Sequence, residues 1–326
     1  MSQPAPDVLV TPGVGAANRR LGILMACAAS ALFAVNGTVS KGILLEGMPA
    51  LRLTELRSAG AFLIILVGLL LWQPQRLRTT RGELPVLAVY GVVGFAAVQV
   101  FYFIAIRELP VGIALLIEYT APIFIALWAR FGEKQPIRQR FWWALALAMV
   151  GLAMVAEVWQ GATLDGFGVL AGFLAALSLA FYFVLGDRMV SRRGRDPVSL
   201  TCYAFGFATL FLTLIQPWWT FPWSILAEDT DLLGPTLPVW ALAVWMIVLG
   251  TVAPFLLIIG SLRHLTATGA SVIGMVEPVL AFAVAWVLLG EALTPLQILG
   301  AVTVLTGVLL AETSRTSRRV DADMPG

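Results

Sequence analysis

Ten long apolar stretches constrain this chain more than any other feature. A helix that crosses about 30 Å of hydrocarbon needs roughly 20 mostly apolar residues. The ten stretches that meet this length are Leu21–Ile43, Pro49–Trp72, Leu84–Ile106, Pro110–Ala129, Phe141–Trp159, Gly166–Gly186, Pro197–Ile215, Pro238–Gly260, Ala267–Leu289 and Pro295–Ala311. Almost no chain remains for a soluble domain. The sequence therefore predicts an all-α integral membrane protein with ten transmembrane helices.

The composition excludes an ordinary soluble domain. Hydrophobic residues make up 59% of the chain and charged residues 12%, whereas soluble domains have about 45–50% and about 25%. The formal net charge of +2 gives no indication of a nucleic-acid partner. Cys27 and Cys202 lie in apolar stretches without Cys or His at metal-ligand spacing. We therefore expect neither a metal site nor another cofactor.

Charges between the stretches predict the orientation. Short cytoplasmic loops collect Lys and Arg, whereas exported loops do not. One alternating set of connections and tails holds most of the bases, and the other set holds only Lys41 and Arg107. The longest connection of the second set, Gln216–Leu237, contains three acidic residues and no base. Both termini are therefore expected in the cytoplasm.

The two halves of the chain repeat each other. A shift of about 156 residues sets Pro122 onto Pro278, and a small gap then sets Gly132-Glu133 onto Gly290-Glu291. Each unit has five stretches, an odd number, so the second unit must enter the membrane with the opposite topology. Two inverted five-helix repeats of this kind suit alternating access. We expect a cytoplasmic tail at 1–20, a first repeat at 21–159, a second, inverted repeat at 160–312 and a cytoplasmic tail at 313–326.

Three segments resemble a known family, namely Phe101–Leu127, Leu249–Gly274 and Met275–Gln297. They resemble the EamA-type members of the drug/metabolite transporter superfamily, and are most similar to threonine/homoserine exporter-like members. The resemblance covers Leu21 to Ala311. It implies a secondary transporter that exports small metabolites, in particular amino acids or related zwitterions, across the bacterial inner (cytoplasmic) membrane. The alternative cargoes are drugs, nucleotide-linked sugars or other metabolites. The Gly132-Glu133 turn resembles the family's helix-end motif, for which we expect a structural role.

Ionisable residues within the stretches are the first candidates for a substrate site, because an ionised group at bilayer depth is energetically costly. Glu118 lies near the middle of the fourth stretch and Glu277 near the middle of the ninth. Either carboxylate could pair with a substrate ammonium group or bind a proton coupled to transport, and a packing role is the alternative. Arg57 could hold a substrate carboxylate or pair with Glu118. For Arg52 and Glu55 we expect structural pairing.

Neutral polar side chains within the stretches complete the predicted substrate site. Small solutes are often held by a few such groups in an otherwise apolar pocket. The candidates are Asn36, Gln99, Tyr102 and Tyr119. Most polar groups of this kind in membrane helices serve packing, which is the alternative here.

Three prolines are predicted to interrupt their helices. Pro122, Pro278 and Pro254 lack a backbone N–H, so each leaves the carbonyl four residues earlier without its usual donor. Such carbonyls are tolerated in a membrane where they line a cavity or where neighbours satisfy them. A plain helix kink is the alternative.

Other classes of protein fit the sequence less well. A membrane enzyme would need a nucleophile with a base, or a metal set, and the one histidine, His264, lies at a predicted cytoplasmic helix end. An ion channel would need a filter-like loop or a ring of acidic residues. We therefore expect no enzymatic activity. The expected partners are the lipid bilayer, a small-molecule substrate and protons, with the chain as a monomer or homodimer.

Overall fold

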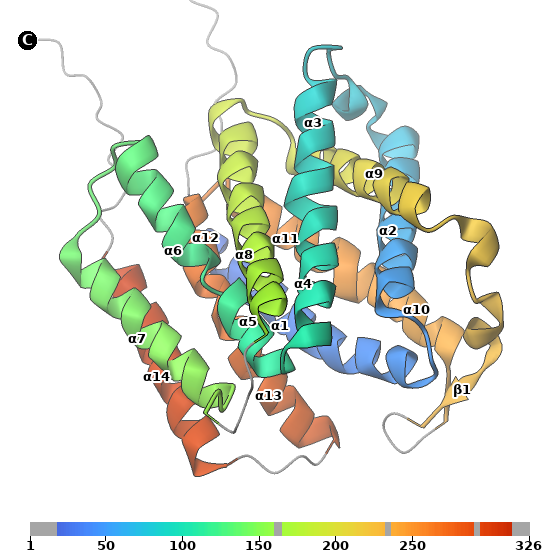
Figure 1. The fold of residues 1–326 in the computed structure, drawn as a ribbon. Helices are drawn as coiled ribbons and strands as arrows, with labels where there is room; N and C mark the ends of the chain where they lie inside the picture. Colours follow the sequence, from blue (N-terminus) through green and yellow to red (C-terminus); the bar gives the residue numbers. More distant parts are fainter. Residues whose placement is uncertain (1–17, 160–164, 232–235, 290–293, 315–326) are drawn as a thin grey trace, which may run out of the picture.

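The computed structural model describes residues 18–159, 165–231, 236–289 and 294–314 as a bundle of helices (Figure 1). Within these residues, nine helices are long and apolar enough to cross a membrane. The remaining apolar helix, α7 (Gln139–Val155), is shorter than the predicted stretch that ended at Trp159. The chain leaves the helix after Val155, and Glu157 adopts a φ of 48°, which few non-glycine residues adopt. The prediction of an all-α membrane protein is confirmed, with nine candidate spans by length in the described part.

The first half of the chain contains four of the nine candidate spans, in addition to the shorter helix α7. Their helices are α1 (Arg19–Leu45), α2 (Ala50–Trp72), the 3-10 turn η1 (Pro74–Leu77), α3 (Leu84–Gly91), the π-helical turn η2 (Val92–Ala96), α4 (Ala97–Glu108), α5 (Val111–Glu118), α6 (Ala121–Leu127) and the π-helical turn η3 (Trp128–Gly132). Helices α3 and α4 form one span through η2, and α5, α6 and η3 form the next.

The second half contains five spans. Their elements are α8 (Gly166–Asp187), the π-helical turn η4 (Arg188–Arg192), α9 (Pro197–Ile215), α10 (Val239–Ile247), the π-helical turn η7 (Val248–Val252), α11 (Ala253–Ser261), α12 (Ala267–Gly274), α13 (Val276–Leu289) and α14 (Pro295–Thr313). The connection after α9 contains the 3-10 turns η5 (Trp218–Thr220) and η6 (Trp223–Ala227) and one antiparallel pair of two-residue strands, β1 (Asp229–Thr230) and β2 (Leu237–Pro238). This strand pair was not expected in an all-α chain.

Side-chain caps fix where several helices begin. The side chains of Asn18, Asp165, Asp196 and Thr266 accept the N–H of Leu21, Gly168, Ser199 and Gly269, respectively. Thr294 and Gln297 form a reciprocal capping box at the start of α14. These contacts satisfy N–H groups that have no partner inside the helix. The helices therefore start where the sequence places a short polar residue before an apolar run.

Interruptions of the helices recur at the same spacing in both halves. The π-helical turn η2 begins at Val92 and η7 begins at Val248, a difference of 248 − 92 = 156 residues. Helix α5 ends at Glu118 and α12 ends at Gly274, again 274 − 118 = 156. In Figure 1, α5 lies below α6, whereas α12 lies above α13. The two corresponding broken spans thus run in opposite directions.

Packing between the helices follows the same correspondence. Helix α4 packs on α8, and their counterparts α11 and α1 pack on each other. Helix α7 packs closely along α14, as Figure 1 shows at the lower left. Gly151 and Gly307 allow this approach, because a Cβ at Gly151 would lie 2.6 Å from the Val304 nitrogen, and one at Gly307 2.6 Å from the Ala148 nitrogen. Small residues allow this close backbone approach in membrane helices.

Candidate functional site

The fourth span breaks at Glu118. Helix α5 ends there, the chain passes through Tyr119 and Thr120, and α6 begins at Ala121 with Pro122 in its first turn. The Thr120 hydroxyl donates to the Ile117 carbonyl at 2.6 Å, and so satisfies a carbonyl at the end of α5. The break therefore places two polar side chains, those of Glu118 and Tyr119, at a helix end inside the bundle rather than at its surface.

The ninth span breaks at the corresponding place. Helix α12 ends at Gly274, and α13 begins at Val276 after the buried Met275. Glu277 lies in the first turn of α13 and Pro278 follows it. The N-terminal end of a helix favours a negative charge, because its N–H groups are unpaired and the helix dipole is positive there. The break thus gives Glu277 a favourable environment within an apolar span.

Side chains from four spans meet around the two breaks. The Tyr119 hydroxyl lies close enough to the Glu277 carboxylate to stabilise its negative charge. Arg57 on α2 attracts Glu277, whereas Glu118 and Glu277 repel each other. Tyr102 on α4 lies within electrostatic reach of both carboxylates. The structure thus brings together five of the seven residues that the sequence proposed as substrate-binding.

The partner of Arg57 differs from the one suggested by the sequence. Its electrostatic interaction is with Glu277, whereas the sequence suggested Glu118. The Arg57 Nε atom is buried and has no hydrogen-bond partner among the described residues. The five side chains of the site are only partly buried, namely Arg57, Tyr102, Glu118, Tyr119 and Glu277. A charged group enclosed by helices yet partly accessible is what a binding site for a polar solute requires.

The other two proposed residues are Asn36 and Gln99, and their polar contacts do not include the two carboxylates. Asn36 on α1 is buried against Gly250 in η7, and its Oδ1 atom has no hydrogen-bond partner among the described residues. Gln99 lies one turn before Tyr102 on α4. Within the described chain, no hydrogen bond joins Asn36 or Gln99 to Glu118 or Glu277. As substrate-binding residues, these two remain predictions, as do the other five.

The third proline, Pro254, lies in the first turn of α11, directly after the π-helical turn η7. In this turn the Thr251 hydroxyl donates to the Met246 carbonyl at 2.9 Å. The Ala253 N–H bonds to the Val248 carbonyl, five residues earlier. The eighth span therefore widens by one residue before Pro254 instead of breaking, as the fourth and ninth spans do.

Arg52 and Glu55 form the structural pair expected from the sequence. Their side chains are buried and 2.7 Å apart. Arg52 also donates to the Gln216 carbonyl at 2.8 Å and to the Thr220 hydroxyl. The pair ties α2 to the connection that follows α9, and so takes no part in the carboxylate site.

Sequence reasoning did not single out Tyr90. Its ring stacks on Tyr182, with ring centroids 5.3 Å apart and planes at 9°. Tyr182 lies against Gly94 of η2, just as Asn36 lies against Gly250 of η7. Since 250 − 94 = 156, the two glycines occupy corresponding positions of the repeat. The repeat spacing could therefore have identified this pair of helix crossings.

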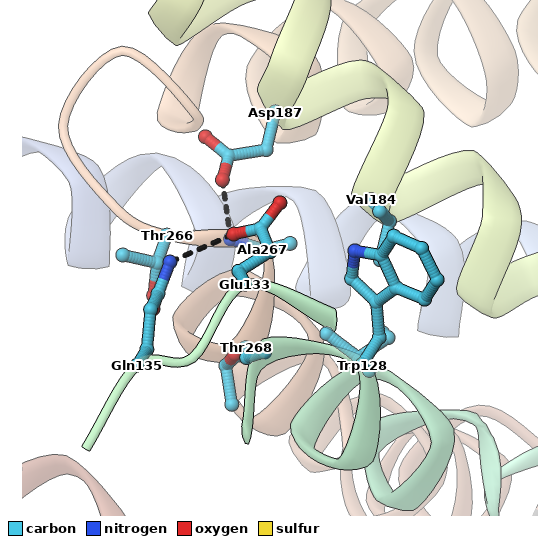
Figure 2. Close-up of a pocket in the computed structure, with 10 residues that line it drawn as sticks. Trp128, Glu133, Gln135, Val184, Asp187, Thr266, Ala267 and Thr268 are labelled. Carbon is cyan, nitrogen blue, oxygen red and sulfur yellow. Dashed lines mark hydrogen bonds between the residues drawn. The ribbon is translucent and has the colours of Figure 1, made fainter. Parts of the chain in front are cut away.

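A small pocket lies where α6, α8 and α12 converge (Figure 2). Glu133, Gln135 and Asp187 are among the residues that line it, with Trp128 and Thr266–Thr268. Glu133 accepts a hydrogen bond from Gln135 at 2.7 Å, and Asp187 accepts one from the Ala267 N–H at 3.5 Å. The Gly290-Glu291 pair that corresponds to Gly132-Glu133 in the sequence lies outside the described residues. No group of three or more metal-ligating side chains is found in the part of the chain that the structure describes.

Long apolar helices, two of them broken at facing carboxylates inside the bundle, define a multi-pass membrane transport protein. The chain belongs to the EamA-like transporter family, whose model matches residues 20–156 and 166–313. It is therefore a transporter of the drug/metabolite superfamily and not an enzyme, as the sequence predicted.

Individual relatives are similar over about a third to a half of this chain, and the chain spans less than two thirds of each relative's length. The threonine/homoserine exporter RhtA of Escherichia coli (strain K12) is 29% identical over 157 residues, which are 48% of this chain and 49% of RhtA. An uncharacterized transporter of Archaeoglobus fulgidus is 30% identical over 177 residues, 54% of this chain and 60% of that protein. The uncharacterized transporter YdfC of Bacillus subtilis (strain 168) is 29% identical over 115 residues, 35% of this chain and 38% of YdfC.

One solved crystal structure has the same fold over almost the whole length. It superposes with a TM-score of 0.73 and 18% sequence identity, and covers 91% of this chain and 98% of the solved one. At this identity the likeness concerns the fold alone.

Proposed function

We propose that this chain is a secondary transporter that exports small metabolites, in particular amino acids or related zwitterions, across the inner (cytoplasmic) membrane. The observation that carries the proposal is the meeting of Glu118, Glu277, Tyr119 and Arg57 at two helix breaks. A zwitterion presents an ammonium group and a carboxylate. Glu118 would pair with the ammonium group, and Arg57 with the carboxylate.

The charge arrangement distinguishes the two carboxylates. Glu277 is stabilised by the Tyr119 hydroxyl and by Arg57. Among the described residues, no hydrogen-bond donor to Glu118 is found, and the Glu277 charge opposes its own. Glu118 is therefore either neutralised by a proton or, when ionised, paired with a cation from outside the protein such as a substrate ammonium group. Protons are for this reason the second proposed partner.

Alternating access is the proposed mechanism. The two halves correspond at a spacing of 156 residues, and their broken spans run in opposite directions (Figure 1). In an inverted repeat, the two halves can exchange conformations and so expose one central site to either side. One chain holds both units, so a monomer suffices, and a homodimer remains the alternative.

The cargo could instead be a drug, a nucleotide-linked sugar or another metabolite. Phosphate-bearing cargo would call for several cations at the site, and Arg57 is the cation that the structure couples to the carboxylates. This favours a zwitterion. RhtA, which is similar over about half of the chain, is a threonine/homoserine exporter, and this similarity supports an amino-acid cargo.

The test is transport by the purified chain in proteoliposomes loaded with radiolabelled threonine, homoserine or a set of hydrophobic amino acids, with and without a pH gradient. We expect Glu118→Gln to reduce efflux at least about a hundredfold. The variant loses the charge-assisted ion pair with the substrate ammonium group, which would be enclosed by the bundle. Glu108→Gln, at an exposed ion pair with Arg107, is the matched control and should transport like the wild type. Equal transport by Glu118→Gln and Glu277→Gln variants and the wild type would show that the carboxylates are structural.

A further inference from the structure

Several ion pairs join the two halves of the bundle at the end where the arginines collect. Those that link the first half to the second are Arg19–Glu312 at 2.8 Å, Arg76–Asp196 at 3.0 Å, Arg195–Glu83 at 3.0 Å, and Glu133 with Arg188 at 3.1 Å and with Arg192. The halves must move relative to each other in alternating access, so an ion pair between them opposes opening where it borders the route to the carboxylate site.

Glu133 is the least exposed of the acidic residues in these pairs. Its side chain is 9% exposed, against 12% for Glu312, 19% for Asp196 and 33% for Glu83. It binds two guanidinium groups at once, one on each of its carboxylate oxygens. Arg188 also lies over the Trp128 ring, 4.9 Å from the ring centroid. The Arg188–Glu133 pair is thus held by an aromatic contact as well as by charge.

The pocket beside Glu133 lies between α6 and α12, the two helices that lead from the breaks at the carboxylate site. Helix α6 starts directly after the break at Glu118 and runs through η3 to Glu133. Helix α12 starts at the pocket and ends at the break before Glu277. Fifteen residues at 1.5 Å each separate Glu118 from Glu133, roughly 20 Å along the helix. Separation of α6 from α12 and α8 at this pocket would therefore open a route towards both carboxylates.

We propose that Glu133, bound by Arg188 and Arg192 of the other half, is a latch that closes the cytoplasmic entrance to the carboxylate site, an inference that rests on the proposed function. In Figure 2, Glu133 lies next to Gln135 and Ala267, with Asp187 above it and Thr268 below it, and all of these residues line the pocket. The latch holds the ends of α6 and α8 together while the site faces outward. Its ion pairs break when the cytoplasmic side opens.

The test measures access to the pocket directly. In a chain whose Cys27 and Cys202 are replaced by Ala, a reporter Thr268→Cys is labelled with a membrane-impermeant maleimide in inside-out vesicles. We expect Glu133→Gln to raise the labelling rate about fivefold, since loss of a partly exposed ion pair shifts an opening equilibrium by up to a factor of this size. Arg192→Gln should give a smaller increase, because Arg188 still holds Glu133.

The matched control is Glu83→Gln. Glu83 also pairs across the halves at the same end, and the hydrogen bond from Thr79, with that from the Thr80 N–H and the charge of Arg195, lowers its pKa. It does not line the pocket, so labelling should stay at the wild-type rate. Unchanged labelling of Glu133→Gln, or an equal rise with Glu83→Gln, overturns the latch.

Failure of the latch and failure of the proposed function are distinguishable, because labelling needs no substrate. If Glu133→Gln leaves labelling unchanged while Glu118→Gln abolishes efflux, the latch is wrong and the transport site stands. If Glu133→Gln raises labelling while both carboxylate variants transport normally, the latch stands and the site assignment is wrong. The thermal unfolding midpoint of each variant shows whether it has kept its fold.

Discussion

At the scale of single residues, we expect the positive charge of Arg57 to decide which cargo the proposed site prefers. Arg57 interacts with Glu277, so the site holds two carboxylates and one guanidinium group. Replacement by Gln removes the group that would bind a substrate carboxylate. We expect Arg57→Gln to lower efflux of a zwitterion about tenfold or more, since a charge-assisted hydrogen bond contributes about 1.5–3 kcal/mol.

The comparison that checks this prediction is efflux of threonine against efflux of the amine that lacks its carboxylate. The amine should be affected much less by Arg57→Gln, whereas Arg57→Lys should retain part of the threonine transport because it keeps the charge but not the planar fork. An equal loss for both cargoes would mean that Arg57 stabilises the fold and not the substrate.

At Gly250 the packing leaves no room for a side chain. A Cβ there would lie 3.0 Å from the Asn36 Cβ and closer still to its amide group. We expect Gly250→Ala to destabilise the chain by about 1–3 kcal/mol through overpacking, measured as a lower thermal unfolding midpoint in detergent. Asn36→Gly should restore part of the loss. Gly37→Ala is the control, since nothing lies within 4 Å of a Cβ at that residue, and a lower midpoint there would refute the packing argument.

The candidate site was largely predictable from the sequence because ionisable residues within apolar stretches are rare. Glu118, Glu277 and Arg57 stand out for this reason, and the structure brings them together. Their pairing was not predictable, since the partner of Arg57 depends on how α2 faces the two breaks. Glu133 was expected to be structural, because its turn resembles a helix-end motif of the family. Its partners on another helix could not be read from the sequence.

At the scale of elements, the two helix breaks position the site. Pro122 follows the break in the fourth span, and its missing N–H prevents a continuous ladder there. We expect Pro122→Ala to favour a straight helix, to turn Glu118 and Tyr119 away from Glu277, and to reduce efflux at least severalfold while the protein stays folded. Pro295→Ala is the matched control, because Pro295 lies in the first turn of α14 behind a capping box. Undiminished efflux by Pro122→Ala would mean that the break does not depend on the proline.

The limits of most helices followed from the sequence, because apolar length and N-terminal caps determine them. Helix α9 has the predicted limits, Pro197–Ile215. The π-helical turns η2 and η7 were not predicted, since an extra residue in a helical turn depends on packing against another helix, here Tyr182 at Gly94 and Asn36 at Gly250. The short α7 was also missed, because its apolar sequence continues past Val155, where the helix ends.

At the scale of the whole molecule, the repeat spacing predicted the correspondence of the halves, and the distribution of arginines predicts the orientation. The arginine-rich connections lie together at the end of the bundle where α3 begins and α6 ends (Figure 1). If this end is cytoplasmic, Arg81 faces the cell interior and Trp219, which is 84% exposed, lies on the other side. In a chain without Cys27 and Cys202, an impermeant maleimide added to intact cells should label Trp219→Cys and not Arg81→Cys. Permeabilised cells, in which both should react, are the control. The opposite pattern would reverse the orientation, and Glu133 would then close the outer entrance instead of the inner one.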